Sequence, residues 1–184
     1  MKSPHEIDIT PVTFSSDMFE ENKIKDEDLI KLSPYGVSLN TDPNRPTMLF
    51  KDESGKYVLP VCINSLEAGV TLSQSTQTLV PITPHKFTGW LMNTLNIQIA
   101  KVIFVEIKGS FQYVRVFLEG HPNYGSVKMR AEEVISMCLH MNADFFATKT
   151  FIERSKKLSV ELGNLKEGIR VNPHLFVKNT PYMQ

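Results

Sequence analysis

The sequence predicts an α+β protein, with a mainly antiparallel sheet and helices packed against it. Strand-like and helix-like runs come in groups rather than in strict alternation, which favours this class over a parallel α/β fold. Three consecutive strand-like runs between residues 99 and 129 are separated only by short turns, and this pattern predicts an antiparallel meander. Hydrophobic residues make up 41% of the chain and include 11 Phe, which suffices for a core.

The first 46 residues give the weakest signals. Residues 6–14 alternate apolar and polar side chains, which predicts a half-buried strand, and Pro11 places that strand at an edge. A short helix is predicted over Glu27–Leu32, ended by the Pro34–Gly36 stretch. Residues 40–46 contain Asn, Asp and two Pro and predict a loop.

A hairpin and two helices are predicted next. Thr47–Lys51 and Tyr57–Ile63 flank a short Gly-containing turn. Asn64 or Ser65 can cap a helix that runs to about Thr76. After a loop at 77–84, a second helix is predicted from Pro84 to about Asn96. Its apolar residues recur at helical spacing and predict a core-facing stripe, formed by Phe87, Leu91, Met92 and Leu95.

The meander and two further helices complete the predicted fold. Its three strands are predicted at 99–107, 111–118 and 126–129. The helix predicted at Ala131–Met141 has a clear core face, made of Val134, Ile135, Cys138, Leu139 and Met141. On the same helix Glu132, Ser136 and His140 form a polar line at i, i+4 and i+8. A buried strand is predicted next at 144–147, followed by a helix at 149–157 that Thr148 caps. Leu175–Val177 is the last apolar segment.

Composition limits the possible functions. Lys plus Arg and Asp plus Glu both count 20, so the formal net charge is zero, and the basic surplus typical of nucleic-acid binders is missing. Cys62 and Cys138 both lie in apolar runs and are expected to be reduced, buried thiols. No stretch approaches the ~18 apolar residues of a membrane span. We therefore expect a soluble, cytoplasmic protein without a membrane partner.

The pattern divides the chain into an N-terminal extension at 1–45, a main domain at 46–157 and a C-terminal tail at 158–184. No P-loop, Rossmann fingerprint, H-E-x-x-H or G-x-S-x-G motif is present. The remaining clues to function in the main domain are the order of its elements and a few polar residues at the ends of those elements.

That order resembles the bifunctional nuclease (BFN) domain family over roughly residues 50–155. The motifs are short and mostly apolar, so the resemblance depends on their order and spacing. They are Leu59–Asn64, Glu67–Val70, Pro81–Phe87, Val102–Ile107, Ser110–Val114 and Arg130–Met137.

The sequence also departs from the family pattern. Asn64 stands where the family has Gly, and Lys86 stands where it has Asp. In the closing motif Ala131 and Glu132 replace Pro and Ser, and Glu133 replaces Asp but keeps the carboxylate.

The resemblance implies a metal-assisted nuclease that hydrolyses DNA or RNA phosphodiesters, with Mg²⁺ or Mn²⁺ as cofactor and no organic cofactor. It also implies a homodimer, which the apolar hairpin of the meander would suit. The altered motifs keep a second hypothesis open, in which the fold serves as a non-catalytic binding or regulatory module.

The candidate site residues follow from the chemistry of phosphodiester cleavage, which needs a base, metal-binding carboxylates and a cation. Glu67, His85 and Glu133 are the catalytic candidates, Glu67 and Glu133 the metal ligands, and Arg130 the phosphate-binding residue.

Each candidate also has a structural explanation. Glutamates in first helical turns complement the helix dipole. A histidine in a first turn is often only a hydrogen-bonding residue, and Arg130 can form an ion pair with a neighbouring glutamate. Phe111 and Tyr113 could stack on bases, but aromatic residues on a strand usually belong to the core.

Overall fold

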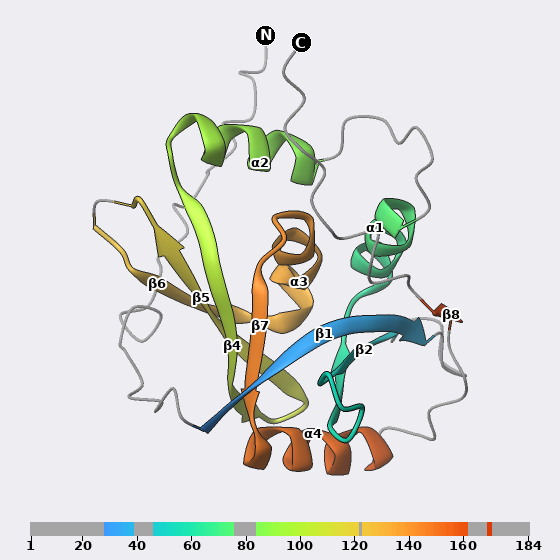
Figure 1. The fold of residues 1–184 in the computed structure, drawn as a ribbon. Coiled ribbons are helices and arrows are strands. Elements are labelled where there is room, and N and C mark those ends of the chain that lie inside the picture. Colours follow the sequence, from blue (N-terminus) through green and yellow to red (C-terminus); the bar gives the residue numbers. More distant parts are fainter. Residues whose placement is uncertain (1–27, 39–45, 76–83, 122, 162–168, 171–184) are drawn as a thin grey trace, which may run out of the picture.

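A computed structural model describes residues 28–38, 46–75, 84–121, 123–161 and 169–170. It confirms the predicted α+β class: four helices pack on a curled, mostly antiparallel sheet (Figure 1). The sheet order is β3-β2-β1-β7-β4-β5-β6, and the short β8 pairs with β1. Among the described strands, β4 and β7 are parallel and the other neighbours are antiparallel. The strands are β1 (Leu29–Ser38), β2 (Thr47–Lys51), β3 (Val58–Cys62), β4 (Gln98–Lys108), β5 (Phe111–Glu119), β6 (Ser126–Arg130), β7 (Asp144–Thr148) and β8 (Ile169–Arg170). The helices are α1 (Ser65–Ser75), α2 (Pro84–Thr94), α3 (Ala131–His140) and α4 (Lys149–Glu161).

Most predicted elements are confirmed, together with the turn and the helix caps that mark their boundaries. The β2–β3 hairpin turns through Gly55, which has a positive φ of 70°. Asn64 caps α1 by accepting a hydrogen bond from the Glu67 amide at 2.8 Å. Thr148 caps α4 in the same way, by accepting from the Phe151 amide at 3.2 Å.

The helix predicted over Glu27–Leu32 is wrong, because Leu29–Ser38 forms strand β1. The first half of β1 pairs with β7 and the second half with β2, with an irregularity between Pro34 and Gly36. Pairing on both sides outweighs the weak local helical pattern. β1 lies within the residues predicted as an N-terminal extension, yet it is an interior strand of the sheet.

The sheet curls far enough for β5 to approach β3 at its other end. Register shifts in β1 and β4 bend these strands. The Gln112 side chain of β5 then bridges the gap: its Oε1 accepts from the Cys62 amide at 3.2 Å, and its Nε2 donates to the Pro60 carbonyl at 2.8 Å. Nε2 also lies 3.1 Å from Ser155 Oγ on α4. Edge strand β3 is thus tied to the opposite side of the sheet.

Helix α3 is central to the core, and its predicted buried face is confirmed for all residues but Met141. Val134, Ile135, Cys138 and Leu139 are buried against the sheet and α1. α4 packs at the opposite end from α2 (Figure 1), with Phe151 and Ile152 buried as predicted. Burial raises the pKa of the Cys138 thiol to about 12, so this residue is an inert part of the core.

The predicted core-facing stripe of α2 is wrong for three of its four residues. Phe87, Leu91 and Leu95 are exposed, and Met92 is half-buried. The face that packs on α3 instead carries His85, which contacts Ser136, and Gly89, four residues further on, which lies against His140 and Met141. Gly89 allows the close approach, because a Cβ there would lie 3.0 Å from Met141 Sδ. The small residue Gly89 sets the contact, whereas a prediction from hydrophobic spacing alone selected the opposite face of the helix.

Several predictions lie outside the described residues: the strand at 6–14, most of the loops at 40–46 and 77–84, and the segment Leu175–Val177. Part of the predicted tail is described, since α4 continues to Glu161 and β8 pairs with β1. Neither cysteine forms a disulfide within the described residues; Cys138 is buried, as expected, whereas Cys62 is only half-buried. Among the described residues no helix is long and apolar enough to cross a membrane.

Candidate functional site

Three helices bring Glu67, His85 and Ser136 together. Glu67 lies in the first turn of α1, His85 in the first turn of α2, and Ser136 in the middle of α3. His85 Nε2 is 2.6 Å from Ser136 Oγ and 3.7 Å from Glu67 Oε2. Two of the four predicted site residues, from separate helices, therefore meet at one point, which we call the helix-junction cluster.

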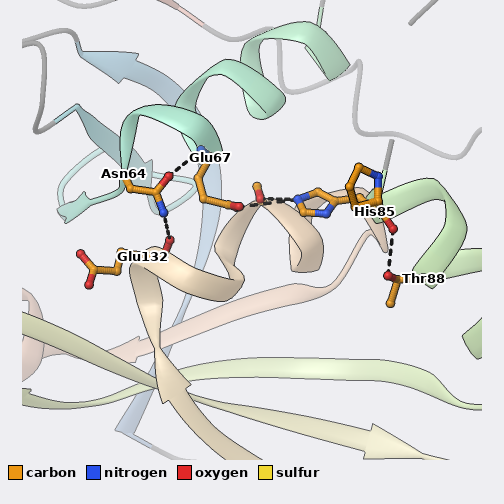
Figure 2. A network of polar contacts seen from close by, with 7 residues as sticks. Asn64, Glu67, His85, Thr88 and Glu132 are labelled. Atoms are coloured by element: carbon orange, nitrogen blue, oxygen red, sulfur yellow. Dashed lines mark hydrogen bonds and ion pairs between the residues drawn. The ribbon is translucent and has the colours of Figure 1, made fainter. Parts of the chain in front are cut away.

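The N-terminal ends of α1 and α3 are joined through Asn64. Its Oδ1 caps α1, and its Nδ2 donates to the Glu132 carbonyl at 3.2 Å. Figure 2 shows the resulting row of contacts from Glu132 through Asn64 and Glu67 to His85, with the Glu132 carboxylate turned away from it. A glycine at position 64, as in the family pattern, could make neither side-chain contact.

The cluster is mostly dry. The side chains of Glu67 and His85 are 12% and 16% exposed, and Ser136 is buried. Burial raises the pKa of the Glu67 carboxyl, and the neighbouring His85 imidazole opposes that shift. Glu67 Oε2 and Thr71 Oγ1, one turn apart on α1, are buried atoms without a hydrogen-bond partner in the described structure. The helix-junction cluster is therefore a buried polar group whose hydrogen bonds are only partly satisfied.

We predict that Glu67→Gln stabilises the protein increasingly as the pH rises. A carboxyl whose pKa is raised in the folded state contributes full stability below its unfolded pKa, and this contribution is lost as the pH rises through the folded pKa. Glutamine stays neutral throughout. Urea unfolding of both proteins between pH 4 and pH 8 should therefore show a difference that grows toward pH 8.

The same change at Glu53, in the exposed β2–β3 turn, controls for the loss of one negative charge. A Glu67→Gln variant that is less stable than the parent at pH 8 would mean that the ion pair with His85 outweighs the cost of burial.

A second histidine borders the cluster. The rings of His85 and His140 have centroids 6.4 Å apart. Burial lowers the pKa of His140, and the nearby His85 and Lys86 lower it further. Protonation of His140 is thus disfavoured in the folded state.

Arg130 and Glu133 belong to a separate group at the start of α3. Arg130 lies 3.7 Å from the Glu132 carboxylate, 3.9 Å from that of Glu133, and 4.4 Å above the Phe111 ring. Its hydrogen bond with Tyr113 raises the pKa of the guanidinium. The Arg130 side chain is 43% exposed, so these ion pairs are screened by solvent.

The predicted site residues thus fall into two groups: Glu67 with His85, and Arg130 with Glu133. The predicted metal ligands, Glu67 and Glu133, are in different groups. In the described part of the chain no three His, Cys, Asp or Glu side chains gather where they could hold a metal ion. Divalent cations such as Mg²⁺ and Mn²⁺ need several oxygen ligands around one point, so these residues do not fit a metal site built from protein ligands alone.

No protein-family model matches this sequence, and no curated protein matches it. The resemblance to the BFN family stays a prediction.

The cluster contains the three residue types of a serine-hydrolase triad, but not its geometry. In such a triad serine and carboxylate contact opposite nitrogens of the imidazole. Here Ser136 and Glu67 both face Nε2. Ser136 is also 1% exposed, within a helix, where no substrate carbonyl can reach its hydroxyl. Serine-nucleophile chemistry is therefore excluded at this site.

Ser136 and Asn64 are the cluster residues that sequence reasoning did not select. The sequence did indicate Ser136 indirectly, because it belongs to the polar line formed with Glu132 and His140. Polar side chains on a buried helix need hydrogen-bond partners from neighbouring elements. Asn64 was recognised as a cap, but its second contact, with Glu132, depends on how α1 packs on α3 and leaves no trace in the local sequence.

Proposed function

We propose that this protein is a BFN-type nuclease that hydrolyses DNA or RNA phosphodiesters, with Glu67 and His85 as its acid–base pair. The supporting observation is the contact between these two side chains, 3.7 Å apart, in a largely water-free junction of three helices. A carboxyl and an imidazole that share one buried environment can serve as general acid and general base in phosphodiester hydrolysis.

In this proposal His85 takes a proton from the attacking water molecule as the water oxygen bonds to phosphorus. The bond from phosphorus to the leaving oxygen breaks, and that oxygen receives a proton. Glu67 suits the second role, because burial raises the pKa of its carboxyl and so keeps a proton available. Ser136 fixes the orientation of the imidazole through its contact with Nε2.

Arg130, in the separate group at the start of α3, is the proposed phosphate-binding residue. It is partly exposed and lies over Phe111, so a substrate phosphate could compete with Glu132 and Glu133 for the guanidinium. Glu133 retains a role only if substrate draws it toward the helix-junction cluster.

The alternative is a binding or regulatory module without catalysis. One observation favours it: Arg130 and Glu133 pair with each other instead of converging on Glu67 and His85. The net charge of zero also favours the binding or regulatory module, because tight binding of nucleic acid depends on a positively charged surface.

The deciding experiment is a cleavage assay with single- and double-stranded DNA and RNA, in Mg²⁺, Mn²⁺ or chelator. We expect cleavage by the parent protein and a loss of about 10²–10⁴-fold in both His85→Ala and Glu67→Gln, the usual cost of removing a general acid or base. Glu53→Gln, purified identically, controls for the loss of one exposed carboxylate and should match the parent, whereas the activity left in His85→Ala sets the upper limit for a contaminating nuclease.

Glu133→Gln separates the two groups of residues. A loss equal to that of Glu67→Gln would place Glu133 in the working site, whereas full activity would confine the site to the helix-junction cluster. Equal cleavage by the parent and by His85→Ala would refute the assignment of the base. No cleavage by any of the proteins would leave the binding module as the remaining proposal.

A further inference from the structure

Strands β4, β5 and β6 turn one side toward the described helices and the other side away from them. On the helix side, Val102, Phe104, Val114 and Val116 belong to one core with residues of α1, α3 and α4, and α2 packs on α3 (Figure 1). Side chains alternate along a strand, so the residues between these and their cross-strand partners point to the other side. We call that side the outer face. It comprises Lys101, Ile103, Glu106, Tyr113, Arg115, Phe117, Ser126 and Lys128.

The centre of the outer face is buried. Ile103 and Arg115, which are cross-strand neighbours, are 2% and 1% exposed. The Arg115 guanidinium donates to Ser126 Oγ at 3.2 Å, and Ser126 on edge strand β6 is also buried. An arginine is almost never buried this completely on a sheet face that water covers. The burial therefore indicates that another segment lies over the outer face.

The chemistry of the outer face indicates what kind of segment fits it. The face is basic, since three cations stand against one carboxylate, that of Glu106. The cations are Lys101, Arg115 and Lys128. The face is also aromatic: the Lys101 ammonium lies 5.1 Å from the centroid of the Phe117 ring, and that of Lys128 lies 5.5 Å from the centroid of Tyr113. Such a surface suits an acidic segment that also carries apolar side chains.

We propose that residues 1–27 of this chain bind the outer face. These residues precede the described part of the chain and contain seven acidic and three basic side chains, so their charge is opposite to that of the face. Five of the acidic residues lie between positions 17 and 27, and residues 6–14 supply apolar side chains for Ile103 and the two aromatic rings. This proposal goes beyond the proposed nuclease function and does not depend on it.

The start of β1 brings this segment to the right part of the sheet. Leu29 pairs with Thr148 at the end of β7, and β7 lies between β1 and β4. With about 4.8 Å between neighbouring strands, β5 is about 14 Å from β1. An extended residue spans about 3.3 Å, so about five residues cover that distance. A segment of 27 residues is therefore long enough to cross the whole outer face.

Charge also distinguishes residues 1–27 from the other stretches outside the described residues. Residues 39–45 and 162–168 each contain one acidic and one basic residue, and residues 76–83 contain neither. The C-terminal stretch 171–184 contains one lysine and no acidic residue. Residues 1–27 are thus the stretch among them that has an acidic excess to match the outer face.

The first test maps the contact with a water-soluble carbodiimide, which joins a carboxylate to an amine only where the two touch. Mass spectrometry of the digested monomer should find peptides that link residues 1–27 to Lys101 or Lys128. The Lys31–Asp144 ion pair, 2.8 Å long, is the internal positive control. Lys56, exposed in the β2–β3 turn, is the negative control. A mixture of ¹⁴N- and ¹⁵N-labelled protein shows whether each link joins one chain or two.

The second test reverses one charge of the outer face. Lys101→Glu should lower the yield of links between residues 1–27 and Lys128 by at least about threefold, because one surface attraction becomes a repulsion. The amides of residues 1–27 should exchange faster in the same variant. Salt at about 1 M should act in the same direction on the parent protein, since it screens surface charges beyond about 3 Å. Lys56→Glu makes the same change of charge on the exposed turn and should match the parent.

A protein that links Lys31 to Asp144 but does not link residues 1–27 to Lys101 or Lys128 would overturn the proposal. So would links that form only between ¹⁴N and ¹⁵N chains, since the occupant would then belong to a second copy. Unchanged links to Lys128 in Lys101→Glu would refute the part that charge plays in the contact.

Discussion

Gly120→Ala is expected to lower the free energy of unfolding by at least about 3 kcal/mol. Gly120 has a φ of +82° at the end of β5, where an L-residue costs about 1–2 kcal/mol. A Cβ at this position would also lie 1.9 Å from the Asn96 carbonyl oxygen. That oxygen is backbone and cannot rotate away, so the connection between α2 and β4 must move, at a cost comparable to overpacking a core.

The matched control is Gly55→Ala in the β2–β3 turn. Gly55 has a similar φ of +70°, but a Cβ there meets nothing within 4 Å. This variant should lose only the conformational cost, about 1–2 kcal/mol. Denaturant unfolding of both variants, followed by circular dichroism, isolates the effect of the contact with Asn96. Equal losses in the two variants would show that Gly120 does not approach Asn96 as described.

Gln112→Leu should destabilise the protein by about 3 kcal/mol, although leucine has nearly the same volume. The Gln112 amide makes three hydrogen bonds in the core, with the Cys62 amide, the Pro60 carbonyl and the Ser155 hydroxyl. Leucine removes all three, and each buried group that loses its partner costs about 1–3 kcal/mol.

Gln98→Leu is the control, because Gln98 lies on the exposed start of β4. It should change stability by no more than about 0.5 kcal/mol. Hydrogen exchange gives a local readout: in Gln112→Leu the amides of edge strand β3 should exchange faster, while those of central strand β4 should follow global stability. Unchanged protection of β3 would mean that Gln112 does not hold the curled sheet together.

Local sequence determined the elements with a clear period or an unambiguous turn. The β2–β3 hairpin, the β4–β5–β6 meander and the buried face of α3 follow directly from apolar spacing. The helix caps at Asn64 and Thr148 could also be predicted from the sequence, because a cap depends on residues within one helical turn.

The candidate site was only half predictable. Glu67 and His85 were chosen because they lie in the motifs of the family resemblance and have the chemistry that phosphodiester cleavage needs, and the structure brings them together on Ser136. Glu133 was chosen in the same way, but it pairs with Arg130 at the start of α3. Nothing local distinguishes these cases, because both carboxylates lie in first helical turns.

By itself, then, the sequence determined the fold class, most of the elements and their caps, since these depend on interactions within a few residues. Only the tertiary structure decided that Leu29–Ser38 is an interior strand, that the packed side of α2 is the one with Gly89, and that Gln112 closes the sheet. Each of these depends on a partner far away in the chain. Long-range pairing and close approach outweigh local preference wherever the local signal is weak or divided between two faces.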